Sequence, residues 1–179
     1  MYKKVTNPLA MQSQKNICES MLELLKTTSF DDITITMLCQ QAHLVRKTFY
    51  RNFETKEDVL ICMLDYHLLE YLEELPSHTH TLEDLSAHFL TFWQTKIEYL
   101  KPLQENALFY LLNRLYLHYL DKLKELLVDS ELSLFPKKDC YALVFHFGGL
   151  CNLLGLWLHN DCDTSIEELI TFTLNINKT

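Results

Sequence analysis

The sequence predicts an all-α protein, and three observations lead to this prediction. Its 179 residues include only three Gly and four Pro, the residues that most often interrupt helices. Apolar side chains recur every three to four positions, whereas the alternation typical of β-strands is nearly absent. With 48% hydrophobic residues, a chain of this length can bury a sizeable core in one or two small domains.

A first helix is expected to begin near Asn7-Pro8 and to end near Thr28-Ser29. Proline suits the first turn of a helix, where its missing N–H would have no intrahelical partner. Apolar residues at helical spacing give this helix an inner face, which consists of Ile17, Met21, Leu24 and Leu25.

Two short helical patterns follow in residues 31–57, separated by a tight turn at residues 42–44. One stripe of the first pattern, at i, i+3, i+4 and i+7, consists of Ile35, Leu38, Cys39 and Ala42. In the second pattern Phe49 and Phe53 recur at i and i+4 and are expected to pack inward. The opposite face is basic and aromatic, with Arg46, Lys47, Tyr50 and Arg51. Two short helices of this kind are typical of a helix-turn-helix DNA-binding motif.

Further helices are expected beyond this motif. Residues 55–58 fit a capping box and begin a long helix that ends at about Leu75. A fifth helix is expected over residues 82–100, broken near Pro102, and a sixth from about Leu103 to Val128. Residues 76–80 and 129–136 are predicted to be loops. Thr81 and Asp84 also fit a capping pattern, and a further capping box at residues 165–168 begins a final helix, whose inner face is Ile166, Leu169, Ile170 and Leu174.

Residues 140–160 contain no Asp, Glu, Lys or Arg, and this stretch is long enough to span a bilayer. This stretch is therefore interpreted either as a membrane helix or as a helix buried by a partner subunit. The polar residues His146 and Asn152 and the small residues at 148, 149 and 155 favour the second alternative. Paired with the final helix, it predicts a four-helix dimer interface, with candidate residues Gly148, Gly149, Asn152, Leu156, Trp157, Ile166, Leu169 and Ile170.

The net charge of −8 is unevenly distributed. Residues 1–56 carry eight Lys or Arg and five Asp or Glu, a net charge of +3, whereas residues 57–179 carry −11. This asymmetry indicates a basic, phosphate-attracting N-terminal part on an acidic body. The alternative is that the acidic residues only solvate the larger helices.

The cysteines and the first residues favour a cytoplasmic protein without a metal site. The six cysteines are widely spread, and no Cys-x-x-Cys occurs, which favours reduced thiols in a core. His78 and His80 lie in a polar loop and give little reason to expect a metal ion. Residues 1–4 are not followed by the apolar run of a secretory signal.

The helix pair resembles the TetR (tetracycline-repressor-like) family of bacterial transcription regulators. The resemblance covers about residues 10–65, and the run Thr-Phe-Tyr-x-x-Phe-x-x-Lys-Glu follows the first helix of the pair at the family's spacing. The positions that match the family's pattern are Thr34, Leu38, Cys39, Ala42, Leu44, Thr48, Phe49, Tyr50, Phe53, Lys56, Glu57 and Leu60. His43 replaces the family's turn glycine and Val45 a common capping serine, whose loss costs about 1 kcal/mol.

The resemblance implies a homodimeric regulator, by family default a repressor, that a small ligand releases from a pseudo-palindromic DNA operator. It divides the chain into a helix-turn-helix domain, 1–56, and a regulatory and dimerisation domain, 57–179. By resemblance, DNA phosphates are bound by Thr34, Tyr50 and Lys56. Arg46 and Lys47, which begin the second helix, are candidates for contacts with base edges or nearby phosphates, and Arg51 is a candidate for either kind of contact. Thr48 is expected either to lie at the groove or to pack within the protein.

The ligand site and the competing functions are less defined. Aromatic residues of the second domain are candidates for a ligand cavity or, alternatively, for the core: Tyr66, Phe89, Trp93, Phe109 and Tyr110. A TetR-like interaction module or co-activator controlled by a protein partner remains an alternative. The sequence contains no Gly-rich phosphate loop, Glu-x-x-His pair or nucleophile motif, so we expect neither an enzyme nor a bound cofactor.

Overall fold

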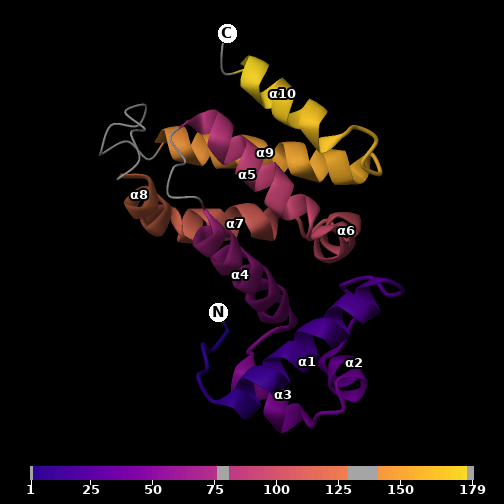
Figure 1. Cartoon of the computed structure of the whole chain (residues 1–179). Coiled ribbons are helices and arrows are strands. Elements are labelled where there is room, and N and C mark those ends of the chain that lie inside the picture. The colour runs from indigo at the N-terminus through magenta and orange to yellow at the C-terminus, as the bar shows by residue number, and fades with distance from the viewer. Residues whose placement is uncertain (1, 76–80, 129–140, 177–179) are drawn as a thin grey trace.

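The computed structural model describes residues 2–75, 81–128 and 141–176, and within these ranges the chain is helical, without strands. The all-α prediction is therefore confirmed. The helices are α1 (Pro8–Leu25), α2 (Ile35–Gln41), α3 (Arg46–Asn52), α4 (Lys56–Glu74), α5 (Leu82–Gln94), α6 (Ile97–Glu105), α7 (Tyr110–His118), α8 (Leu120–Val128), α9 (Tyr141–His159) and α10 (Ile166–Ile176). Helices α1–α3 form one end of the molecule, and α4 runs from them into a second group, α5–α10 (Figure 1).

The first group is a helix-turn-helix unit supported by α1. Asn7 caps α1 through its side-chain oxygen, which accepts from the N–H of Leu9 at 2.9 Å, and Pro8 begins the helix as predicted. Helix α1 packs across α2 and α3, and the buried residues between them include Ile17, Met21, Leu38, Phe49 and Phe53. His43 takes a left-handed conformation with φ 54°, so a histidine makes the turn at which glycine is the least strained residue.

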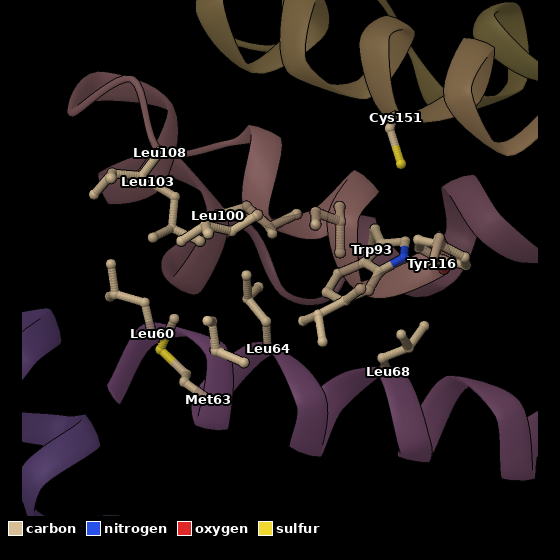
Figure 2. Packing of buried hydrophobic residues seen from close by; sticks show 14 of the residues in the cluster. Leu60, Met63, Leu64, Leu68, Trp93, Leu100, Leu103, Leu108, Tyr116 and Cys151 are labelled. Atoms are coloured by element: carbon tan, nitrogen blue, oxygen red, sulfur yellow. Dashed lines mark hydrogen bonds between the residues drawn. The ribbon is translucent and has the colours of Figure 1, made fainter. Parts of the chain in front are cut away.

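Helix α4 connects the two groups and is anchored at its start. The Thr55 hydroxyl and the Asp58 carboxylate form the predicted capping box. The apolar face of α4 then enters the body, where Leu60, Met63, Leu64 and Leu68 point toward a layer that contains Trp93, Leu100 and Leu103 (Figure 2). A single helix thus carries packing from the helix-turn-helix unit into the larger core.

The predicted break near Pro102 is wrong. The helix ends instead at Thr95, whose hydroxyl donates to the carbonyl of Phe92 at 2.7 Å, and the next helix begins after Lys96. Pro102 lies inside α6. A proline removes one backbone hydrogen bond from a helix, and here Leu100, Pro102 and Leu103 are buried, so packing keeps the segment helical.

The single helix predicted from Leu103 to Val128 is also wrong, because this segment forms the end of α6, then α7 and α8. The first interruption follows Asn106, whose side chain donates to the Pro102 carbonyl at 2.9 Å, and Ala107 is left-handed with φ 57°. The second is at Tyr119, where α7 ends. Local hydrogen bonds of this kind compete with helix continuation and are not visible in the apolar spacing.

Helices α9 and α10 complete the body. The predicted capping box of α10 is confirmed, because Ser165 and Glu168 exchange side-chain to backbone hydrogen bonds of 3.1 and 3.2 Å. Gly155 allows α9 to approach Phe109 closely, since a Cβ there would lie 3.1 Å from the ring. Among the described residues α9 alone is long and apolar enough to cross a membrane, and half of that segment is buried inside the protein.

The cysteines of the described residues are free thiols. Cys39 and Cys151 are buried, whereas Cys18, Cys62 and Cys162 are half-buried. The predicted loops at residues 76–80 and 129–136 lie outside the described residues, as does Cys140.

A polar network at Asp65 connects the N-terminal arm to both groups of helices. The Asp65 carboxylate, 2% exposed on α4, accepts hydrogen bonds from the hydroxyls of Tyr2 and Tyr119. The Lys4 ammonium lies 3.2 Å from the Tyr119 oxygen and 3.8 Å from the carboxylate. Next to it, the Lys3 N–H donates to the carbonyl of Asn52 at the end of α3 (3.1 Å). A buried carboxylate therefore joins the arm, α4 and the α7–α8 junction.

Replacing Asp65 with Ala should destabilise the protein by about 2–4 kcal/mol, because two hydroxyls lose their buried acceptor. Chemical denaturation followed by circular dichroism measures this loss. Asp121→Ala is the matched control, since that carboxylate is exposed and its removal should change stability by less than about 0.5 kcal/mol. Equal stability of the two variants would contradict the role given to Asp65.

Candidate nucleic-acid interface

One face of α3 is exposed and carries basic and aromatic side chains. Arg46, Lys47, Tyr50 and Arg51 are exposed, whereas Phe49 and Asn52 on the other face are buried. Phe49 and Phe53, with ring centroids 5.6 Å apart, are both fully buried, so this side of the short helix faces the interior. The structure therefore brings together the four residues that the sequence predicted on this face.

Arg46 and Tyr50 form a pair one helical turn apart. The Arg46 guanidinium donates to the Tyr50 hydroxyl at 3.3 Å and lies 5.9 Å from the centre of its ring. The Tyr50 ring is 46% exposed and rests with its edge toward Phe49. A guanidinium held in this way keeps further N–H donors for a phosphate or a guanine edge.

The two predicted threonines differ in position. Thr34 is the exposed N-cap of α2, and its hydroxyl oxygen accepts from the N–H of Met37 at 3.2 Å. Thr48 is half-buried within α3, and its carbonyl accepts from the Asn52 side chain at 2.9 Å. Val45 caps α3 without any side-chain hydrogen bond, as its apolar side chain requires. Thr34 is thus the more accessible of the two for a backbone phosphate.

Lys56 has a structural task that sequence reasoning missed. Its ammonium donates to the carbonyl oxygens of Phe30, Asp31 and Ile33, the last two at 2.9 and 3.0 Å, and lies 4.5 Å from the centre of the Phe30 ring. An ammonium has three donors, and all three are used within the protein. The predicted phosphate contact of Lys56 remains untested and requires one of these bonds to open.

The turn that Lys56 holds also contacts the body. The N–H of Phe30 donates to the side-chain oxygen of Asn106, at the end of α6, at 2.8 Å. Arg114 on α7 lies 3.3 Å from the carboxylate of Glu57 in the first turn of α4. Displacement of α6 or α7 would therefore act on the segment that precedes α2 and on the start of α4.

The residues predicted to line a ligand cavity do not form one surface. Phe89 and Trp93 are fully buried in the core, with centroids 6.4 Å apart. Tyr66 and Tyr110 are 71% and 54% exposed, and Phe109 packs against Gly155. Helical spacing alone gave no sign that Tyr66 lies on the outer face of α4. Contrary to the prediction, the five residues therefore do not line one cavity in this structure.

The predicted dimer residues also divide into two groups. Trp157, Ile166 and Leu169 are buried in the core of their own chain, and the Trp157 indole donates to the carbonyl of Thr164 at 2.7 Å. Contrary to the prediction, the side chains of these three residues therefore face the core of their own chain and not a second subunit. Ile170 is half-buried and Gly148 partly exposed, and the exposed members are Gly149, Asn152 and Leu156.

Two exposed aromatic residues of α9 were missed. Tyr141 lies two turns and Phe145 one turn before Gly148, and Phe145 is 85% exposed. Their i, i+4 spacing relative to Gly149 was the signal in the sequence. For metal ions, the described part of the chain has no group of three or more His, Cys, Asp or Glu side chains suited to hold one.

Comparisons with known proteins identify solved structures of similar fold. No protein-family model and no curated protein matches the chain. Among solved structures, it is similar to the fatty acid degradation regulator FadR from Bacillus halodurans, with 19% identity, a TM-score of 0.64 and coverage of 94% of this chain and 93% of that one.

Two further solved structures are similar. The transcriptional regulator FadR from Bacillus subtilis, in complex with stearoyl-CoA, has 18% identity and a TM-score of 0.64, with 93% and 96% of the two chains covered. The dihydroxyacetone kinase operon activator DhaS has 16% identity and a TM-score of 0.57, with 92% and 93% covered. At these identities the likeness establishes the fold. None of the three names mentions the TetR family.

Lys56→Met should lower the free energy of unfolding by about 1–3 kcal/mol without DNA, because three carbonyl oxygens lose a charged donor. Thermal and urea unfolding measure this change. Lys47→Met, on the exposed start of α3, should leave stability unchanged. A Lys56→Met protein of wild-type stability whose DNA binding has a smaller salt slope would instead support the phosphate contact.

Proposed function

We propose that this chain is a sequence-specific DNA-binding transcriptional regulator of the TetR-like type. It acts as a homodimeric repressor that a small ligand releases from a pseudo-palindromic operator. The observation that carries the proposal is the exposed basic and aromatic face of α3, held on a helix-turn-helix unit by Phe49 and Phe53. A helix of this kind enters the major groove and contacts base edges through residues near its N-terminus.

The roles of the site residues follow from their positions. Arg46 and Lys47 begin α3 and contact base edges or nearby phosphates, Tyr50 and Thr34 contact phosphates of the DNA backbone, and Arg51 contacts either. The division at residue 56 falls within the first turn of α4, so α4 belongs to both the DNA-binding and the regulatory part. The three similar structures, all of proteins named as regulators, support a regulator in preference to an enzyme.

Dimerisation uses the outer face of α9. Residues at 141, 145, 149, 152 and 156 are exposed, and their spacing of three to four places them on one face of the helix. Tyr141, Phe145 and Leu156 are large and apolar, and Gly149 between them allows a second helix to approach closely. Together they form the apolar patch expected of a subunit interface.

The effector is a small molecule bound in the second group of helices, and the protein acts in the cytoplasm without an intrinsic cofactor. One similar structure contains stearoyl-CoA, which supports an apolar effector site in this fold. A ligand that prefers the DNA-incompetent spacing of the two subunits would release the operator by shifting the population of conformations.

Selection of genomic DNA fragments by the purified protein tests the function. Wild type should enrich a pseudo-palindromic site, and Arg46→Ala should weaken binding to it by about 1–3 kcal/mol at fixed salt. Tyr50→Phe should weaken it as well, because the hydroxyl that holds the guanidinium is lost. Lys122→Ala, at an exposed lysine of α8, is the matched control and should bind as wild type does.

A folded dimer that enriches no DNA would contradict the proposal. It would favour the alternative of an interaction module or co-activator controlled by a protein partner. The test is fair only if Arg46→Ala retains the circular dichroism spectrum and oligomeric state of wild type, as its exposed position predicts.

Phe145→Glu should convert the dimer to a monomer in sedimentation analysis, because a charge would be buried at the centre of the proposed interface. The side chain is exposed within one chain, so the fold and melting behaviour of the monomer should persist. Leu126→Glu, at an exposed apolar residue of α8, should remain dimeric. Dimerisation unaffected by Phe145→Glu would exclude this face of α9.

A further inference from the structure

Among the described residues of the body, two buried polar side-chain atoms have no hydrogen-bond partner: the Tyr71 hydroxyl oxygen on α4 and Nε2 of His88 on α5. Tyr71 is fully buried. An unpaired hydroxyl in an apolar interior costs free energy that phenylalanine at the same place would not. Core stability therefore does not account for a tyrosine at this position.

The two atoms belong to a layer of aromatic rings between α4, α5 and α7. The Tyr71 ring lies 4.9 Å from His88, 5.4 Å from Phe92 and 5.9 Å from Tyr116. Tyr116 in turn accepts a hydrogen bond of 2.9 Å from the Trp93 indole. Figure 2 shows Trp93 and Tyr116 side by side, with the thiol of Cys151 pointing toward them from α9.

A small recess reaches this layer from the side of α7 and α9. It has a volume of about 10 Å³, about the least space that holds one water molecule. Its lining includes Leu117 and Leu120 on one side, Leu143 and Val144 on the other, and the rings of Tyr116 and Phe147. These two rings are stacked with centroids 4.8 Å apart. The Tyr116 ring thus borders both the recess and Tyr71, so its displacement would join the two.

The residues that line the recess carry no charge, and the charged group that acts on His88 is the Glu74 carboxylate. Helix α9 contains no Asp, Glu, Lys or Arg, and burial lowers the pKa of His88 and brings that of His146 to about 4, so both are neutral at pH 7. The Ser86 hydroxyl lies 3.4 Å from Nε2 of His146. An anionic ligand group here would lose its hydration without gaining a counter-charge.

The geometry points to a binding site for a neutral, mainly apolar molecule with a single hydrogen-bonding group. Such a molecule enters through the recess between α7 and α9, displaces the Tyr116 ring and pairs its polar group with the Tyr71 hydroxyl and Nε2 of His88. As the effector site of a DNA-binding regulator this assignment rests on the proposed function, whereas ligand binding itself is measured without DNA.

The position of the recess connects the site to the DNA-binding face. A molecule between α7 and α9 separates these helices, and α7 packs on α4. Arg114 on α7 pairs with Glu57 at the start of α4, next to the Lys56 ammonium that holds the turn before α2. Movement of α7 is therefore transmitted to the helix-turn-helix unit through side chains already in contact.

Isothermal titration of the full chain with 1-decanol, decanoate and decanoyl-CoA tests the site. We expect saturable binding of decanol at one molecule per chain and at least about tenfold weaker binding of the two charged compounds. Tyr71→Phe should weaken decanol binding about five- to tenfold, the effect of one lost hydrogen bond. It should also raise the melting temperature of the ligand-free protein, because the unpaired hydroxyl is removed.

Two further variants complete the design. Tyr66→Phe removes an exposed hydroxyl from the same helix and should bind decanol as wild type does. Val144→Trp, at a half-buried position of the recess, should block entry while the protein remains folded. A melting temperature that rises in Tyr71→Phe together with lost affinity is not expected of a merely structural tyrosine.

The site assignment is overturned if no decanol binds, if binding is not saturable, if Tyr71→Phe binds as tightly as wild type, or if decanoate or decanoyl-CoA binds at least as tightly as decanol. Operator binding is then measured with and without decanol. Tyr71-dependent decanol binding by a chain that selects no DNA would retain the site and contradict the proposed function. Operator binding without any decanol binding would retain the proposed function and contradict the site.

Discussion

The structure depends on the continuous helix α4. Its first turn is held by the Thr55–Asp58 capping box and by Lys56, which fixes the turn before α2, while its apolar face enters the core of the second group of helices (Figure 2). A helix transmits displacement along its length because each backbone hydrogen bond restrains the next turn. Anything that moves the middle of α4 therefore changes the orientation of α1–α3.

Three polar contacts restrict how freely the two groups move against each other. Phe30 is bonded to Asn106, Glu57 to Arg114, and the buried Asp65 to tyrosines from the arm and from the α7–α8 junction. Only the last has a buried carboxylate, which makes it the costliest to break. The exposed pair contributes little to stability, whereas the Asp65 contact holds both the arm and the C-terminal end of α7 on α4. One firm and one weak contact fit the proposed repositioning of the helix-turn-helix unit by the second group of helices.

Apolar residues serve two different purposes in the second group of helices. The inner faces of α4, α5, α7 and α9 supply a dense aromatic layer, whereas the outer face of α9 leaves Phe145 and Leu156 exposed. The sequence of α9 is apolar on all sides, and its hydropathy alone fits a membrane helix, a core helix or a subunit interface. Its burial on one side against this chain and its exposure on the other are what favour a helix shared between two subunits.

Local sequence determined the elements whose signals lie within a few residues. The capping boxes at Thr55 and Ser165, the start of α1 at Pro8 and the inward positions of Phe49 and Phe53 were all predictable, because caps and helix faces depend on neighbours three or four residues away. The fold class and the basic face of α3 were predictable from the same local patterns. Tertiary structure decided the rest: that Pro102 stays inside a helix, that Lys56 binds three carbonyl oxygens, that Tyr66 faces outward while Trp93 is buried, and that Trp157 serves its own core. These outcomes depend on contacts between residues far apart in the chain, and such contacts decide which side of an apolar helix is covered.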